Sequence, residues 1–131
     1  MIFVDSNVPM YLIGDAHPNK LEAQLALERI VGEGERMVTD VEVFQEILHR
    51  YRAIDRRDAI QPAFDVLIAT VDDVFSMDLD DVDRARTVLL GRWELSARDA
   101  LHVAVMQRHD VQRILSFDRH FDLVPGFERV S

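Results

Sequence analysis

Residues 1–7 read MIFVDSN, and the interpretation of the whole chain starts from them. An apolar run leads up to Asp5, which predicts a short buried strand that ends at an acid. Ser6 and Asn7 are typical of a turn or a helix cap, and a short helix is expected to continue to about Ile13. The chain therefore opens with a strand, an acid and a helix, in that order.

The same order of strand and helix recurs from this opening to the end of the sequence. Further apolar runs predict strands at about 36–39, 74–77, 113–116 and 127–130. Helical spacing of apolar residues predicts helices at about 18–31, 41–51, 58–70, 78–90 and 96–109, with a loop at 91–95. Such alternation indicates an α/β fold, a three-layer sandwich in which a mostly parallel sheet is covered by helices on both faces. We find no linker or repeat, so a single domain is expected over residues 1–131.

The composition limits the chemistry that the chain can perform. It has 131 residues and no cysteine, which excludes disulfides, thiolate metal sites and a cysteine nucleophile. No apolar run reaches the ~18 residues of a membrane helix, and no basic segment precedes the first apolar run as in a signal peptide. We therefore expect a cytoplasmic protein without membrane contact. The net charge of −9 means that contact with nucleic acid needs a local arginine patch or a bound cation.

Acidic residues follow the predicted strands. In parallel α/β sheets, ligands bind beyond the carboxyl ends of the strands, where this chain carries Asp5, Asp40, Asp78 and Asp118. Each has a structural alternative, because aspartate also caps helices and stabilises turns. Asp40, for example, is expected to cap the helix that follows it. Position alone makes these acids candidates for a site.

Two further acids lie inside predicted helices. Asp99 is the third residue after Ser96, and Ser-x-x-Asp before an apolar run resembles a capping box. Asp99 also shares a stripe with His102, which places it toward the packed side of its helix. Glu46 falls roughly opposite the apolar stripe of its own helix, so periodicity predicts an exposed side chain. That stripe consists of Phe44, Ile47, Leu48 and Tyr51.

Acids gathered in one crevice would need a cation. Neighbouring carboxylates repel, and a hard divalent ion such as Mg²⁺ or Mn²⁺ suits a site made only of oxygen atoms. Such an ion polarises a phosphoryl oxygen and lowers the pKa of a bound water. Rival sites lack their motifs, because the sequence has no HExxH, P-loop, GxGxxG or GxSxG. His102 is expected to be a packed core histidine rather than a metal ligand.

Four segments together resemble the PIN-domain ribonucleases, and among them the VapC toxins of bacterial toxin–antitoxin pairs. MIFVDSN resembles the family's first strand with its acid, and VFQEILHRY, residues 43–51, resembles its glutamate-bearing helix. SARDALHVAVM, residues 96–106, closely resembles the segment with the third acid. ILSFDRHFDLVPGFERV, residues 114–130, resembles the strand, the fourth acid and the hairpin-like tail that close the domain.

The resemblance implies a metal-dependent endoribonuclease, the toxin of a type II toxin–antitoxin system. It assigns Asp5, Glu46, Asp99 and Asp118 to an acidic quartet that binds Mg²⁺ or Mn²⁺. Ser6 and Ser116 would be hydroxyls beside the first and fourth acids, and Asp122 matches an acid found in some members. The resemblance also implies a homodimer and a small VapB-type antitoxin, whose C-terminal segment enters the active-site groove.

Contacts with RNA would come from a small basic surface. Arg50, Arg52, Arg56 and Arg57 are candidates to contact phosphates, or they form a solvated basic loop. Phe44, Tyr51, Trp93 and Phe117 could stack on bases, although core packing is the ordinary role of each. Two other functions stay open: a PIN-like module that binds RNA or a partner without cleavage, and a small-molecule phosphatase built on Asp5. The segment DSNVP lacks the DxD pattern that a phosphatase of the haloacid-dehalogenase type would need.

Overall fold

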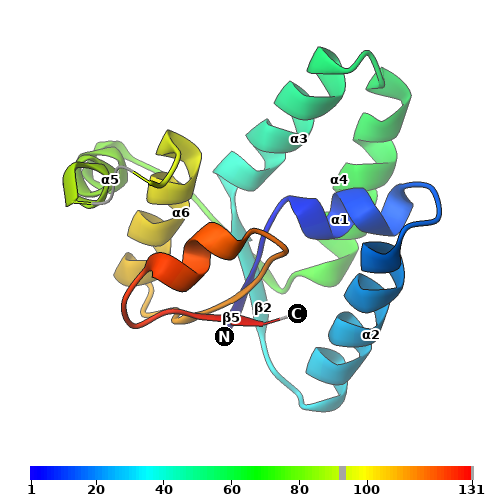
Figure 1. Ribbon diagram of the computed structural model, residues 1–131, viewed down its shortest axis with the longest axis horizontal. Coiled ribbons are helices and arrows are strands. Elements are labelled where there is room, and N and C mark those ends of the chain that lie inside the picture. The colour runs from blue at the N-terminus through cyan, green and yellow to red at the C-terminus, as the bar shows by residue number, and fades with distance from the viewer. Residues whose placement is uncertain (92–93, 131) are drawn as a thin grey trace.

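A five-stranded parallel sheet forms the centre of the computed structural model, which describes residues 1–91 and 94–130 (Figure 1). The strands are β1 (Ile2–Val4), β2 (Met37–Asp40), β3 (Asp73–Phe75), β4 (Arg113–Leu115) and β5 (Glu128–Val130). Each pair of neighbouring strands is parallel, and the order across the sheet is β3-β2-β1-β4-β5. The predicted α/β fold with a parallel sheet is confirmed.

Helices cover both faces of this sheet. They are α1 (Asn7–Ile13), α2 (Pro18–Gly32), α3 (Val41–Ala53), α4 (Ile60–Thr70), α5 (Leu79–Gly91) and α6 (Ala97–Arg108), with the 3₁₀ helices η1 (Arg57–Ala59) and η2 (Arg119–Leu123). In Figure 1, α5 and α6 lie to one side of the strands, and α1, α2 and α4 lie to the other. The predicted helices are all present, whereas Arg92 and Trp93 of the predicted loop lie outside the described residues. Within the described ranges, no helix has the length and apolar character needed to cross a membrane.

The strand β1 is the most deeply buried part of the sheet. Ile2, Phe3 and Val4 are each 0% exposed, as expected of a central parallel strand that has helices on both faces. The same apolar cluster continues into β4 and the inner faces of the helices. Because β1 is held in this core, the residue that follows it, Asp5, is held in a fixed position.

The last strand does not close a hairpin. β5 runs parallel to β4, with Arg113 opposite Glu128 and Leu115 opposite Val130. Two parallel strands need a connection that carries the chain back to the edge of the sheet where the first strand begins. Here η2 and the turn at Gly126 form that connection. Gly126 has a φ of 83°, a conformation that glycine adopts without strain. The expected hairpin-like tail is therefore wrong.

The order of the strands reverses beside β1. The chain passes from β1 to β2 and β3 on one side, and it then returns to place β4 and β5 on the other side. In α/β sheets, ligands bind in the crevice at such a switch point, outside the carboxyl ends of the strands. Asp5 follows β1, Ser116 follows β4 and Asp40 ends β2, so these three residues meet at one edge of the sheet.

Asp78 does not join the other strand-end acids, because it caps a helix. Its Oδ1 accepts a hydrogen bond from the backbone N–H of Asp81 at 3.2 Å, and Oδ2 of Asp81 accepts one from the backbone N–H of Asp78 at 3.1 Å. Asp81 is itself 1% exposed and also accepts a hydrogen bond from Nε of Arg108 at 2.6 Å. The alternative structural role of Asp78 is the one that the fold uses.

Candidate active site

Asp5 is the buried acid at the end of β1. It is 4% exposed, and its carboxylate accepts hydrogen bonds from the backbone N–H of Ser6 at 2.8 Å and from the hydroxyl of Ser116 at 2.6 Å. Burial raises the pKa of Asp5 to about 6, even though the charge of His102 and these hydrogen bonds act to lower it. The hydrogen bonds hold the Asp5 carboxylate in place. Ionisation of this buried group costs free energy unless a cation lies nearby.

Glu46 faces the site, and the prediction that it is exposed is wrong. It is 8% exposed, whereas Leu48, which was assigned to the core stripe, is 45% exposed. The helix α3 packs on two sides: Phe44 meets Phe64 of α4 with ring centroids 5.0 Å apart, and the side that carries Glu46 turns toward α6. Periodicity identified the first of these sides. The second is buried by a polar contact with His102, which an apolar pattern does not reveal.

His102 lies between two acids in the core. The side chain is 0% exposed, with Nδ1 2.8 Å from Oδ2 of Asp40 and Nε2 2.7 Å from Oε1 of Glu46. Burial lowers the pKa of His102, but the charges and hydrogen bonds of Asp40 and Glu46 outweigh it and hold the pKa well above its ordinary value. The raised pKa favours the protonated ring, in which both nitrogens donate to these carboxylates. The prediction of a core histidine is confirmed, and both ring nitrogens face carboxylate partners.

A chain of hydrogen bonds runs from Asp40 through His102 and Glu46 to Ser6. The Ser6 hydroxyl donates to Oε2 of Glu46 at 2.5 Å. Burial raises the pKa of Glu46, yet the bonds and charge of His102 and the Ser6 hydroxyl leave that pKa below its ordinary value. At the other end, Oδ1 of Asp40 accepts a hydrogen bond from the backbone N–H of Val43 at 3.0 Å, which confirms Asp40 as the cap of α3. One chain thus ties β2, α6, α3 and the end of β1 together.

Asp99 and Asp118 form the other half of the site. The backbone N–H of Asp99 donates to the Ser96 hydroxyl at 3.1 Å, so the predicted cap is confirmed. The Asp99 side chain is 9% exposed, and burial, followed by the charge of Asp118, raises its pKa. One ligand atom each from Asp99, Asp118 and His120 lie within 4.8 Å of one another. The backbone of Asp99 is therefore part of the helix cap, while its carboxylate lies close to that of Asp118.

Ser116 joins the two halves. Its hydroxyl donates to Oδ2 of Asp5 at 2.6 Å and accepts the backbone N–H of Asp118 at 3.0 Å. Asn7 braces the same point, with its side-chain amide 3.2 Å from the Ser116 hydroxyl and 3.4 Å from Oδ2 of Asp5. Carboxylate oxygens of Asp5 and Glu46 also lie within 4.8 Å of each other. The structure pairs Asp5 with Glu46 and Asp99 with Asp118, and Ser116 links the two pairs at the switch point.

The remaining predicted residues lie around this centre. Asp122 pairs with Arg129, with Nε 2.9 Å from Oδ1, and this hydrogen bond lowers the pKa of Asp122. Arg56 pairs with Asp58 at 3.1 Å. The four candidate arginines, Arg50, Arg52, Arg56 and Arg57, are all exposed. Of these, Arg50 lines a cavity beside the acids.

The sequence analysis missed the link between Asp40 and His102. Asp40 was identified only as a cap, and His102 only as part of the core. A signal was available for His102, since it lies three residues after Asp99 on the same face of its helix. For Asp40, no signal was available, because the contact joins residues 62 positions apart.

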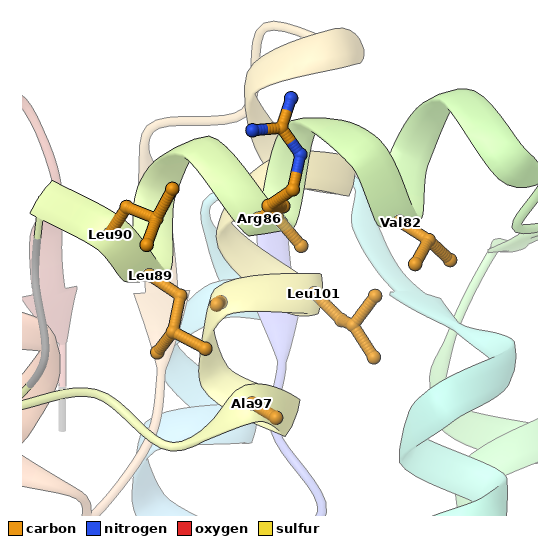
Figure 2. Close-up of a pocket in the computed structure, with 8 residues that line it drawn as sticks. Val82, Arg86, Leu89, Leu90, Ala97 and Leu101 are labelled. Carbon is orange, nitrogen blue, oxygen red and sulfur yellow. The ribbon is translucent and has the colours of Figure 1, made fainter.

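A second hollow lies between α5 and α6, away from the acids (Figure 2). It has a volume of about 290 Å³, and its lining is almost entirely apolar, with Leu89 on α5 and Leu101 on α6. On α5, Val82 is 51% exposed and Leu90 is 71% exposed. The lining of this hollow contains no acid, so the hollow offers an apolar surface and no carboxylate ligand for a metal.

The fold and its group of acids define a class that comparison with known proteins identifies. The PIN domain family matches residues 2–126, and the chain belongs to this family. Within it, the chain is a ribonuclease of the VapC type, the toxin class of type II toxin–antitoxin systems. Ribonuclease VapC13 of Mycobacterium tuberculosis and a VapC ribonuclease of Mycobacterium bovis are each 59% identical over 131 residues, which is 100% of both chains. Ribonuclease VapC23 of Mycobacterium tuberculosis is 38% identical over 118 residues, 90% of this chain and 93% of that one.

Solved structures show the same fold at lower sequence identity. VapC20 of Mycobacterium tuberculosis, described as a toxin that cleaves the sarcin-ricin loop, has a TM-score of 0.80 and 23% identity, and the match covers 99% of this chain and 98% of that one. VapBC2 from Rickettsia felis, bound to a DNA fragment from its promoter, has a TM-score of 0.73 and 15% identity, with coverage of 99% and 98%. These likenesses confirm the three-layer PIN-like arrangement.

Proposed function

We propose that the acidic quartet binds Mg²⁺ or Mn²⁺ and that the chain uses this ion to cleave RNA endonucleolytically. The proposal is supported by two pairs of neighbouring acids, Asp5 with Glu46 and Asp99 with Asp118, which Ser116 links through hydrogen bonds to the Asp5 carboxylate and the Asp118 backbone. The donors fit a hard cation, because they are oxygen atoms, and burial raises the pKa of both Asp5 and Asp99 when no cation is near. A bound ion of this kind would polarise a phosphoryl oxygen and lower the pKa of a coordinated water.

The protein's own residues prepare this site before substrate arrives. Ser116 and Asn7 orient the Asp5 carboxylate, and Ser6 and His102 orient Glu46 from both of its oxygens. Partners of this kind fix the direction of metal ligands, and their loss ordinarily costs about 10–100-fold in affinity or activity. Asp5, Asp99 and Asp118 are the acids we assign to the ion. Glu46 acts beside them, directly or through water, and Asp122 stays a candidate for a supporting acid.

Cleavage of RNA with and without divalent ion tests this function. We expect the purified chain to cut structured RNA in Mg²⁺ or Mn²⁺, to lose this activity on chelation and to regain it when the ion returns. Sequencing of the new ends should find internal cuts with a 5′-phosphate and a 3′-hydroxyl. Activity that survives chelation and dialysis would contradict the metal assignment, and release of single nucleotides from the ends would contradict the endonuclease assignment.

The affinity for the ion should depend on pH because Asp5 must ionise to bind it. With the pKa of Asp5 at about 6, the carboxyl group is protonated at lower pH, and a proton competes with the cation. We expect Mn²⁺ affinity to fall by about tenfold for each pH unit below this pKa. Calorimetry at pH 5 and pH 7.5 measures it, with Asp73→Asn on the exposed edge of β3 as a control that keeps the same profile. Equal affinity at both values would contradict the role of Asp5.

The same raised pKa acts on folding in the absence of metal. Between about pH 4 and pH 6 the folded chain holds a proton on Asp5 that the unfolded chain has released. Stability from this group therefore falls as the pH rises through that window. Bound cation reverses the cost, so stabilisation by Mn²⁺ should be larger at neutral pH than at pH 5.

We also propose a VapB-type antitoxin as partner. The relatives are VapC ribonucleases, and similar solved structures include a toxin–antitoxin complex from Klebsiella pneumoniae, with a TM-score of 0.68, 16% identity and coverage of 100% of this chain and 97% of that one. The net charge of −9 suits a basic antitoxin segment. Cytoplasmic location follows from the same pairing and remains a proposal.

A homodimer is the last part of this proposal, and the apolar hollow between α5 and α6 supports it. We expect a second copy to cover the exposed side chains of Val82 and Leu90. Val82→Glu should then convert the dimer to a monomer in light scattering, because it buries a charge in an apolar contact. Leu21→Glu, on the exposed face of α2, is the matched control and should remain dimeric. A monomeric unmodified chain would contradict the dimer.

A further inference from the structure

A small cavity opens beside the acids, between α1 and α3. It has a volume of about 280 Å³, near the lower end of the ~300–1,000 Å³ typical of small-ligand pockets. Its lining consists of Asn7, Met10 and Tyr11 from α1 and Arg50 and Tyr51 from α3. Among these residues, only Asn7 contacts the acidic site. The acidic site therefore does not explain the other four lining residues.

Asn7 is the wall that the cavity shares with the acidic site. Its amide nitrogen lies 3.4 Å from Oδ2 of Asp5 and 3.2 Å from the Ser116 hydroxyl, and its Oδ1 accepts the backbone N–H of Phe117 at 3.3 Å. These bonds fix the amide in place. A group in the cavity is therefore separated from the Asp5 carboxylate by the Asn7 side chain alone. This spacing would suit two neighbouring parts of one substrate.

The lining suits a flat ring next to a phosphate. Tyr11 is held by Phe117, edge-on with ring centroids 5.2 Å apart, and Tyr51 is 8% exposed, so both rings are fixed. Among the described residues, the Arg50 side chain forms no hydrogen bond or ion pair, whereas the neighbouring Arg56 is paired with Asp58. Unpaired RNA bases stack on tyrosine rings and on guanidinium planes, and arginine also binds phosphate.

We propose that this cavity holds an unpaired nucleobase of the RNA, immediately beside the bond that the acids cleave. The proposal rests on the ribonuclease site described above and names how it selects substrate. Tyr11 and Tyr51 contact the base, Asn7 separates it from Asp5, and Arg50 contacts the phosphate that flanks it. Cleavage then requires a single-stranded position and depends on which base occupies it.

Binding of small nucleotides without divalent ion gives the first test. The probes are the four nucleoside 5′-monophosphates and, as the baseless control, ribose 5-phosphate. Heteronuclear NMR of the full chain should show shifts of the Asn7 amide and Tyr11 ring signals with nucleotides. We expect at least one nucleotide to bind about tenfold or more tightly than ribose 5-phosphate, the usual scale of a stacked base.

Variants give the second test. Tyr11→Leu should remove the preference for a nucleotide over ribose 5-phosphate, and Tyr11→Phe should keep it. In cleavage of single-stranded RNAs that differ only beside the cut, Tyr11→Leu should raise KM about tenfold and lose the base preference, with a smaller change in kcat. Arg50→Ala, an exposed change without risk to folding, should weaken all the phosphorylated probes. Arg84→Ala removes the same charge from α5, on the other side of the molecule in Figure 1, and should change nothing.

Several outcomes would overturn the proposal. One is equal binding of ribose 5-phosphate and all nucleotides, and another is an unchanged base preference in Tyr11→Leu. A third is that nucleotides leave Asn7 and Tyr11 unshifted while an arginine-rich peptide shifts them, which would assign the cavity to a protein partner. The titration contains no divalent ion, so it tests the cavity separately from cleavage. If the chain binds bases selectively but cleaves no RNA, the cleavage site is contradicted and the base-binding cavity is not.

Discussion

Asp5→Asn is expected to lower kcat/KM for RNA cleavage by more than about 100-fold, since even residues that only orient metal ligands cost 10–100-fold. The substitution keeps the shape of the side chain and removes the negative charge that we propose binds the ion. It should weaken the metal-free fold only modestly: burial already disfavours the charged form of Asp5 and raises its pKa to about 6, although an amide keeps just one of the two oxygens that accept hydrogen bonds from Ser6 and Ser116. Kinetics in Mg²⁺ and urea unfolding in a metal-free buffer measure the two effects separately.

The control for this change is Asp73→Asn, which removes one exposed carboxylate that pairs with Arg36 at 3.4 Å. It should cleave RNA at the normal rate. The assignment of Asp5 to the metal site would be contradicted if folded Asp5→Asn protein bound Mn²⁺ with unchanged affinity and kept a tenth or more of the activity. Loss of activity together with loss of the fold would contradict the account of its burial.

His102→Ala is expected to destabilise the fold by about 3–5 kcal/mol, the usual cost of breaking a buried ion pair from one side. The change leaves Asp40 and Glu46 in the core without the imidazolium that both of them contact. This loss is a large fraction of the ~5–15 kcal/mol that stabilises a typical domain. Urea unfolding at pH 6 measures it, with His49→Ala on the exposed side of α3 as the matched control.

The effect of His102 should also change with pH. Its pKa is raised in the folded chain, so its contribution is complete below the ordinary histidine pKa of about 6.5 and is lost as the pH rises toward the folded value. The gap in stability between the unmodified chain and His102→Ala should therefore narrow at alkaline pH. A gap that widens would mean that the ring is neutral.

A triple variant separates charge from packing. Asp40→Asn and Glu46→Gln combined with His102→Leu remove all three charges, and stability should recover in part, because an apolar or neutral replacement of a buried charge cluster is often tolerated. RNA cleavage should not recover, since Glu46 is changed. If stability does not recover, the three residues stabilise the fold by their shape and hydrogen bonds rather than by balancing their charges.

The sequence was most informative where local chemistry determines structure. The strand that ends at Asp5, the cap at Ser96 and the cap at Asp40 depend on neighbours within a few residues, and the structure confirms all three. The alternation of strands and helices predicted the parallel sheet for the same reason. The direction of the last strand depends on how η2 returns the chain, and short-range patterns do not contain it.

Glu46 shows why part of the site was beyond local reasoning. Its burial is caused by His102, 56 residues further along the chain, and by Ser6, 40 residues before it. An amphipathic pattern registers apolar contacts only, so it placed Glu46 in solvent. The resemblance to a family placed it in the site, because a family's motif carries such distant contacts without explaining them.

The strand β4 enters the sheet beside β1 although it is translated near the end of the chain. While the ribosome is still making the protein, earlier elements can fold, but one edge of β1 stays open until residues 113–115 emerge. Until then Asp5 lacks the Ser116 hydroxyl and Asp118 has not been made. In the proposed site, a nascent chain that stops short of residue 113 therefore lacks both a hydroxyl that orients Asp5 and one of the four acids.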